Sequence, residues 1–308
     1  MPSLRATIED PPPLPSTQTL LDPACRKKLE ALSLVSKRVF AGQTKGERRS
    51  NKRGSSIEFA DFREYALGDD LRYVDWKAYG RLEKLFLKLF VEEEDLSIHL
   101  LVDTSKSMDF GSPVTKADYA RRLAAALGYV ALSEYDRVLL TSFSGGLNEP
   151  MPPLRGKPGV FPFFQFLETK LPVGGETRLG DALTQYAART KTNGIAVVIS
   201  DFFDETHERG IKALLSRRFQ VVLLHVLDEE ELHPTLTGDL RLVDAETQAV
   251  REVSISPHLI AQYEARVEGF CAGLQRLAGR YNLDYVRAST GTPFEDVVLK
   301  SLRGGVVR

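Results

Sequence analysis

The sequence predicts an α/β fold with a doubly wound, mostly parallel sheet and an N-terminal extension of one helix and one strand. Short aliphatic runs without polar alternation recur along the chain, which is typical of strands covered by helices on both faces. Amphipathic helical segments separate these runs, and this alternation favours right-handed crossovers between parallel strands. With 308 residues, 43% of them hydrophobic, the chain can bury one large core and still carry a smaller unit. The runs that predict strands are residues 98–102, 138–140, 195–199 and 221–224.

Two helices of the predicted core have clear start signals. Residues 116–133 place alanine, leucine and valine on one face, and Thr115 with Asp118 resembles a capping box. Ser256 and Pro257 provide an N-cap and a first-turn proline for a second helix. We expect its buried face to consist of Ile260, Tyr263, Val267, Phe270, Leu274 and Leu277. Just before this helix, two apolar stretches within residues 241–253 flank a turn-prone segment, which predicts a β-hairpin.

The chain is expected to have three parts. Residues 1–18 are rich in proline and predict a disordered tail. Residues 19–96 predict a helix at 19–39, a basic loop, a segment dense in charged and aromatic residues, and a strand at 85–91. Residues 97–308 predict the α/β domain itself.

Bulk charge and cysteine content narrow the classes of partner. Lysine and arginine total 41 against 42 for aspartate and glutamate, so no global field draws the protein to nucleic acid or acidic lipid. The basic loop at 45–53 lacks the interleaved aromatic residues that stack on bases, which favours a solvated loop over a nucleic-acid site. Cys25 and Cys271 are interpreted as packing residues in a reduced interior. No apolar run approaches the roughly 20 residues of a membrane-spanning helix, so we expect a cytoplasmic protein.

Oxygen-bearing side chains follow two of the predicted strands. Asp103 ends the first run and is followed by Ser105 and Ser107, whose alternation puts all three on one side. Asp201 ends the run at 195–199, and Thr177 follows two glycines at the start of a helix. The carboxyl ends of parallel strands meet at one edge, so these five residues are expected to converge.

Such a set of oxygen donors suits a hard divalent cation, with Mg²⁺ favoured and Mn²⁺ an alternative. Two carboxylates and neutral hydroxyls leave a coordination position open for an acidic side chain of a partner protein. The alternative is that Asp103, Ser105 and Ser107 only cap a helix. The addition of Thr177 and Asp201 favours the metal site.

The segment Asp103-Thr104-Ser105-Lys106-Ser107 resembles the D-x-S-x-S motif of the metal-ion-dependent adhesion site in von Willebrand factor A domains. Residues 54–59 and 63–76 resemble the signature of the bacterial domain-of-unknown-function 58 family. That resemblance implies work with a MoxR-type AAA+ ATPase in a chaperone-like or metal-insertion assembly. Asp201 is followed by Phe202-Phe203-Asp204 instead of the usual Asp-Gly turn. A vestigial, unoccupied site is therefore kept as an alternative.

The signature region supplies weaker candidates for partner contact. They are Arg63, Asp69, Asp70, Arg72 and Trp76. The favoured interpretation is a local network of salt bridges and turns around a buried Trp76, because neighbouring opposite charges usually pair with each other.

The sequence therefore predicts a non-enzymatic binding module that recognises an acidic residue through its cation. A metal-dependent phosphohydrolase is the alternative, since an aspartate at a strand end near magnesium can be a nucleophile. Enzymes that resemble haloacid dehalogenases need a second aspartate two positions later, where this chain has Ser105. Neither a Walker motif nor a G-x-S-x-G nucleophile elbow is present. His99 and His225 lie inside aliphatic runs and are expected to be core residues.

Overall fold

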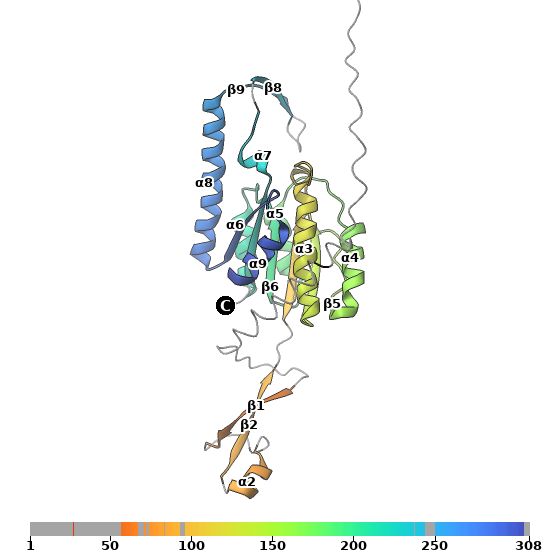
Figure 1. The fold of residues 1–308 in the computed structure, drawn as a ribbon, viewed down its shortest axis with the longest axis vertical. Coiled ribbons are helices and arrows are strands. Elements are labelled where there is room, and N and C mark those ends of the chain that lie inside the picture. Colours follow the sequence, from red (N-terminus) through yellow and green to blue (C-terminus); the bar gives the residue numbers. More distant parts are fainter. Residues whose placement is uncertain are drawn as a thin grey trace, which may run out of the picture. The chain divides into compact units, whose positions relative to one another are not determined.

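The computed structural model describes residues 27, 57–66, 71, 74–82, 84–92, 96–236, 238–243 and 250–304. The chain separates into two compact units, one within residues 41–96 and the other built on residues 97–308 (Figure 1). The predicted tail, the predicted basic loop and, apart from Lys27, the predicted helix at 19–39 lie outside the described residues.

The larger unit is an α/β fold around one mostly parallel sheet, as the sequence predicts. Within the described residues the strand order is β10-β7-β6-β3-β4-β5. All neighbouring pairs are parallel except β4 and β5, which are antiparallel. The strands are β3 (Ser97–Asp103), β4 (Arg137–Phe143), β5 (Leu154–Arg155), β6 (Ile195–Ser200), β7 (Gln220–Leu227) and β10 (Asp284–Ser289). Strands β3, β4, β6 and β7 correspond to the predicted strands, whereas β5 and β10 were not predicted. In β10, polar residues interrupt the apolar ones, so it has no aliphatic run.

Helices cover both faces of this sheet (Figure 1). One face is covered by α3 (Lys116–Ser133), with α4 (Val160–Thr169) and α9 (Phe294–Gly304) packed beside it. On the other face, α5 (Leu179–Arg189), α6 (His207–Ser216) and α8 (Pro257–Tyr281) share one apolar core with the strands. The packing on the first face is tight, because a Cβ on Gly128 of α3 would clash with the ring of Phe163 on α4. The described residues also include two short 3₁₀ helices, Lys106–Met108 and Lys157–Gly159.

The predicted start signals of the long helices are confirmed. The Thr115 side chain accepts a hydrogen bond from the backbone N–H of Asp118, and Ser256 accepts one from Leu259. The hairpin expected before α8 is formed by β8 (Gly238–Val243) and β9 (Val250–Ile255). The short helix α7 (Glu229–Leu232) follows β7.

The predicted buried face of α8 is only partly correct. Val267, Leu274 and Leu277 are buried, together with Cys271, whereas Tyr263 is exposed. Figure 1 shows why: the N-terminal half of α8 extends beyond the sheet toward the β8–β9 hairpin, and the C-terminal half lies beside the strands.

The smaller unit consists of a β-hairpin and a short helix. Strands β1 (Ile57–Glu64) and β2 (Phe86–Glu92) pair in antiparallel fashion, and α2 (Trp76–Leu82) precedes β2. The predicted strand at 85–91 corresponds to β2, whereas β1 was not predicted. Asp75 caps α2, since its Oδ1 accepts hydrogen bonds from the backbone N–H groups of Lys77 and Ala78.

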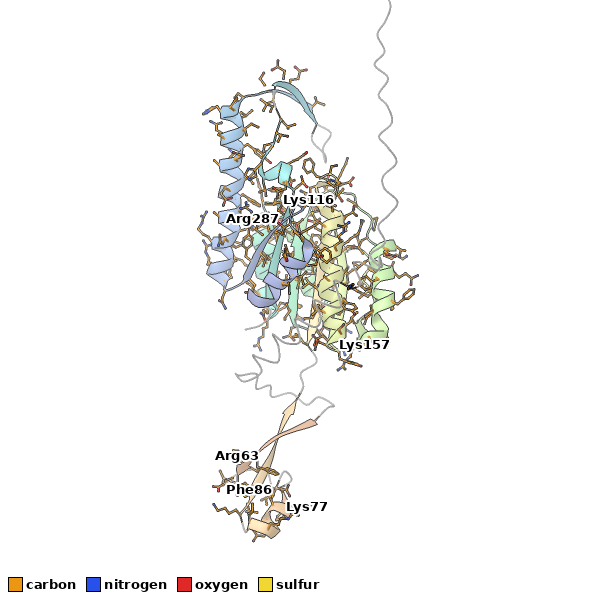
Figure 2. The ribbon with its side chains drawn as sticks, in the orientation of Figure 1. Arg63, Lys77, Phe86, Lys116, Lys157 and Arg287 are labelled. Carbon is orange, nitrogen blue, oxygen red and sulfur yellow. The ribbon has the colours of Figure 1, made fainter. Side chains whose placement is uncertain are left out.

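The expectation of a buried Trp76 is wrong. Its side chain is 61% exposed and packs edge-on against Tyr79, with ring centroids 6.3 Å apart. Helix α2 has no buried residue, because so small a unit has little apolar surface with which to cover it. Arg63 is exposed on β1 (Figure 2), and Asp69, Asp70 and Arg72 lie outside the described residues.

Among the described residues, no helix combines the length and the hydropathy that a membrane crossing requires.

Candidate metal centre

The predicted site residues lie at the carboxyl edge of the parallel sheet, where its winding reverses. From β3 the chain proceeds to β4 on one side, and later to β6 on the other side of β3. Asp103 is the last residue of β3, and Asp201 directly follows the last residue of β6. Loops diverge at such a switch point and leave room for a ligand.

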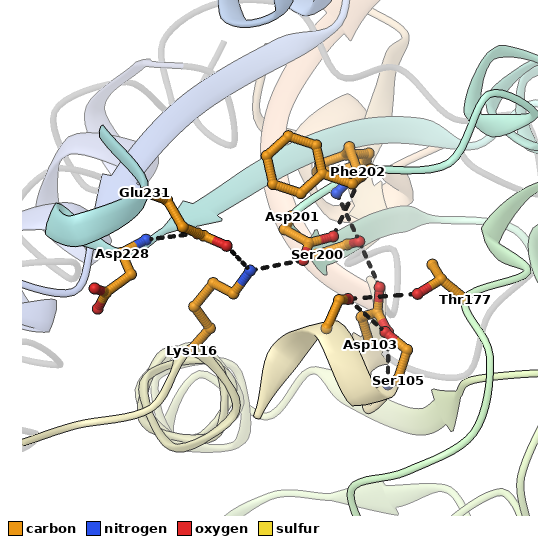
Figure 3. A network of polar contacts seen from close by, with 11 residues as sticks. Asp103, Ser105, Lys116, Thr177, Ser200, Asp201, Phe202, Asp228 and Glu231 are labelled. Carbon is orange, nitrogen blue, oxygen red and sulfur yellow. Dashed lines mark hydrogen bonds and ion pairs between the residues drawn. The ribbon is translucent and has the colours of Figure 1, made fainter. Parts of the chain in front are cut away.

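Four of the five predicted ligands form one chain of polar contacts (Figure 3). Asp103 Oδ1 accepts hydrogen bonds from the backbone N–H of Ser105, at 2.9 Å, and from its hydroxyl, at 2.6 Å. The Ser105 hydroxyl lies 3.1 Å from that of Ser107, which lies 3.4 Å from Thr177 Oγ1. The four side chains come from two segments about seventy residues apart in sequence.

Two glycines bring Thr177 to this group. Gly174 and Gly175 have φ angles of 152° and 85°, which residues other than glycine rarely adopt. The backbone there pairs with the loop that follows β3: Lys106 N–H donates to Gly175 O at 3.0 Å, and Gly174 N–H donates to Thr104 O at 2.8 Å. The two loops are therefore fixed to each other by their backbones.

Asp103 is fully buried and fully hydrogen-bonded. Its Oδ2 accepts a hydrogen bond of 2.6 Å from the hydroxyl of Ser200, the last residue of β6. Burial and the negative charge of Asp201 together raise the pKa of Asp103 to about 7, although hydrogen bonds from Ser105 and Ser200 act to lower it. A cation beside Asp103 would relieve both unfavourable effects.

Asp201 differs from the other four because a lysine holds it. Lys116, the first residue of α3, places its ammonium nitrogen 2.8 Å from Asp201 Oδ2 and 2.6 Å from Glu231 Oε1 (Figure 3). Burial alone would lower the pKa of Lys116, but the carboxylates of Asp201 and Glu231 outweigh it and raise that pKa. Lys116 is therefore an internal cation within the candidate centre.

A strained turn follows Asp201. Phe202 is buried and has a φ of 57°, in the left-handed region that costs a non-glycine residue about 1 kcal/mol or more. Its backbone N–H donates to the Ser200 hydroxyl at 3.0 Å, and the N–H of Phe203 donates to Asp201 Oδ1 at 3.2 Å. The bond from Phe203 orients the Asp201 carboxylate where the sequence departs from the usual Asp-Gly turn.

The donor set fits a hard divalent cation. The oxygen-to-oxygen distances of 2.6 to 3.4 Å include the roughly 2.9 Å between adjacent ligands of octahedral Mg²⁺. Three carboxyl side chains, those of Asp103, Asp201 and Glu231, lie in this group with one ammonium, so the group has room for added positive charge. No cluster of three or more His, Cys, Asp or Glu side chains suited to a metal occurs in the described part of the chain. A cation here would thus depend on hydroxyls, with Asp103, Ser105, Ser107 and Thr177 as its ligands and Lys116 competing for Asp201.

Three residues of this network, Lys116, Ser200 and Glu231, were not predicted from the sequence. One signal was available for Lys116, because a lysine in the first turn of a helix opposes the helix dipole and suggests a nearby carboxylate. Ser200 directly precedes Asp201, and its position at a strand end was an equally local signal. Glu231 gave none, since its distance from Lys116 in sequence depends on the fold.

Comparison with known proteins assigns the chain to a family. A sequence model described as "Protein of unknown function DUF58" matches residues 61–269, and the chain belongs to this family. It is 28% identical over 241 residues to the uncharacterized protein Rv1480 of Mycobacterium tuberculosis, an alignment that covers 77% of this chain and 76% of the relative. The uncharacterized protein Mb1516 of Mycobacterium bovis matches to the same extent.

Solved structures with some similarity include two from Bacteroides. They are the conserved hypothetical protein BatB of Bacteroides thetaiotaomicron and an aerotolerance-related membrane protein of Bacteroides fragilis, each 18% identical, with TM-scores of 0.42 and 0.43. Each alignment covers 68% of this chain, and 97% and 98% of the respective structures. A von Willebrand factor type A protein of Catenulispora acidiphila is 15% identical, with a TM-score of 0.40 over 70% of this chain and 44% of that structure.

Proposed function

We propose that this protein is a non-enzymatic, cytoplasmic binding module that recognises an acidic residue of a partner protein through a bound divalent cation, Mg²⁺ before Mn²⁺. The observation that carries the proposal is the convergence of Asp103, Ser105, Ser107 and Thr177 at the switch point of the sheet. These residues offer one carboxylate and three neutral hydroxyls, too few negative charges to saturate a dication. A carboxylate from outside would complete its coordination.

The nature of the side chains favours binding over hydrolysis. A phosphohydrolase that used Asp103 as its nucleophile would need a general acid or base beside the leaving group. Two positions after Asp103 stands Ser105, whose hydroxyl donates to Asp103 itself. Lys116, the nearby ammonium, is occupied by Asp201 and Glu231.

The proposed partner is a MoxR-type AAA+ ATPase or its client protein. This part of the proposal comes from the resemblance of residues 54–59 and 63–76 to the family signature. The exposed Trp76 of α2, together with Arg63 on β1, offers a second contact surface for such a partner. The cation would bind the acidic residue of the partner, and α2 would offer an apolar contact.

The test is co-purification of the full chain with a MoxR-type AAA+ ATPase from the same organism. We expect the complex to form in Mg²⁺, to dissociate in EDTA, and to weaken at least tenfold in Asp103→Asn. Asp118→Asn is the matched control, since the Asp118 carboxylate is exposed on α3, where it pairs with Arg121. The backbone N–H of Asp118, which donates to Thr115 Oγ1, is unchanged by the substitution. A complex of equal strength in EDTA and in Asp103→Asn would refute metal-dependent recognition and move the contact to another surface.

A further inference from the structure

Two phenylalanine rings flank the candidate metal centre and remain open to solvent. Phe110 lies in the loop after β3, which also carries Ser105 and Ser107, and Phe203 lies in the loop after β6, two residues beyond Asp201. Phe110 is 43% exposed and Phe203 is 42% exposed. Neither ring was predicted to be part of the site.

Both rings face the same buried cation. The ammonium nitrogen of Lys116 lies 6.0 Å from the ring centroid of Phe110 and 5.6 Å from that of Phe203. Since the same ammonium is 2.8 Å from Asp201 Oδ2, the two rings border the carboxylate side of the centre. We call Phe110 and Phe203 the aromatic rim.

Phe203 is held in place from behind. Its ring packs on that of Phe270 of α8, with centroids 5.1 Å apart and an interplanar angle of 30°. Its backbone N–H donates to Asp201 Oδ1. An exposed ring with fixed orientation loses little conformational entropy when it is covered, as residues in binding hot spots do.

Shielding of Lys116 explains only part of this arrangement. The Lys116 ammonium lies over one face of each ring, yet both residues remain more than two fifths exposed to water. Exposed aromatic surface next to a polar site is typical of a contact that a partner completes.

We propose that the aromatic rim selects acidic residues that have an apolar neighbour in the partner's sequence. The inference rests on the proposed function, because an acidic side chain that reaches the cation brings its flanking residues over the loops after β3 and β6. An apolar flanking residue would bury its surface against Phe110 and Phe203, whereas a serine or glycine would leave both rings exposed to solvent. The occupant is therefore an extended segment with an acidic residue directly beside a phenylalanine or leucine.

The test uses two fluorescein-labelled synthetic peptides, one with glutamate between two phenylalanines and the other with glutamate between two serines. Fluorescence polarisation with the full chain in Mg²⁺ should show that the phenylalanine peptide binds at least about fivefold more tightly than the serine peptide, because it buries one apolar side chain. The double variant Phe110→Ala/Phe203→Ala should bind both peptides with the affinity that wild type has for the serine peptide. Phe161→Ala is the matched control, because Phe161 is 66% exposed on α4 and should keep the preference.

The outcomes separate this inference from the proposed function. Equal, Mg²⁺-dependent binding of both peptides overturns the rim and leaves metal-dependent recognition standing. A preference that survives in the double variant also overturns it. Binding of neither peptide in Mg²⁺, or equal binding in EDTA, overturns both proposals together. Should the double variant fail to fold, each single alanine variant is expected to lose part of the preference, and an unchanged preference in both would overturn the rim.

Discussion

The ammonium of Lys116 lies 2.8 Å from Oδ2 of Asp201, with both side chains almost completely buried, at 1% and 0% exposure. A charge held this deep depends on its partner, because the desolvation cost remains when the partner is removed. Lys116→Met should therefore destabilise the fold by roughly 3–5 kcal/mol, measured by urea unfolding monitored by circular dichroism.

The control for this variant is Lys212→Met. Lys212 forms an exposed pair with Glu208 one helical turn away, at 2.9 Å, and such pairs contribute little to stability because water screens them. The double variant Lys116→Met/Asp201→Asn should recover part of the lost stability, since it also removes the unpaired carboxylate. A loss in Lys116→Met no larger than in Lys212→Met would contradict the structural role given to this ion pair.

Metal binding should be visible as stabilisation of the folded protein. A cation that binds only the folded state adds about 2.7 kcal/mol at a concentration one hundred times its Kd. Mg²⁺ or Mn²⁺ is thus expected to raise the Tm of the wild type, and Asp103→Ala should remove most of that rise. The measurement is a thermal unfolding series over metal concentration.

Two controls distinguish specific metal binding from a nonspecific effect of salt. Asp118→Ala removes an exposed carboxylate elsewhere on α3 and should keep the full metal response. Na⁺ at matched ionic strength should not reproduce it. Were wild type and Asp103→Ala to respond alike to Mg²⁺, the assignment of Asp103 as a ligand would be wrong.

The sequence predicted the sheet well where strands are aliphatic on both faces, as in β3, β6 and β7. It failed for β10, in which Arg287 is exposed and pairs with Glu268 of α8 at 2.7 Å. Polar and apolar residues mix in β10 because it lies at the edge of the sheet. The position of a strand in the sheet depends on the strand order, which no single segment of sequence determines. The prediction that Trp76 is buried was also wrong. Its apolar character favours burial, but the small unit has too little apolar surface to cover it.

The centre shows a similar division. Asp103 and Ser105 could be placed together because they belong to one loop, and the rule for carboxyl edges extended this to Thr177 and Asp201. Lys116, Glu231 and the aromatic rim could not be inferred. Their meeting depends on how α3, α7 and two loops pack, which spacing along the chain does not encode.

The position of Thr177 should depend on the unusual backbone of Gly175. An alanine there would have to adopt a φ near 85°, and its Cβ would lie 3.2 Å from Ser144 Oγ. Gly175→Ala should cost about 1–2 kcal/mol in urea unfolding and weaken the metal response. Gly146→Ala is the control, because a Cβ there meets nothing within 4 Å. Equal behaviour of the two variants would show that the loop tolerates strain and that Thr177 needs no such support.

A buried histidine provides a pH dependence that is independent of the centre. His99 lies inside β3, fully buried, with Nδ1 2.6 Å from the hydroxyl of Tyr186 on α5. Burial lowers the pKa of His99 from 6.5 to about 4, because the charged ring would lose its hydration. Between about pH 4 and pH 6.5, His99 is therefore neutral in the folded state and protonated in the unfolded state.

The sign follows from that difference: stability is unaffected above about pH 6.5, falls as the pH drops toward about 4, and stops falling on this account below it. At pH 5 the penalty from His99 is about 2 kcal/mol by linkage. We expect His99→Gln, which keeps a polar partner for Tyr186, to lose less free energy of unfolding than wild type between pH 7.5 and pH 5. Urea unfolding at both pH values measures this difference. If the two proteins lost the same free energy over that interval, the ring of His99 would have to be protonated in the folded state, and its burial inside β3 would not govern its charge.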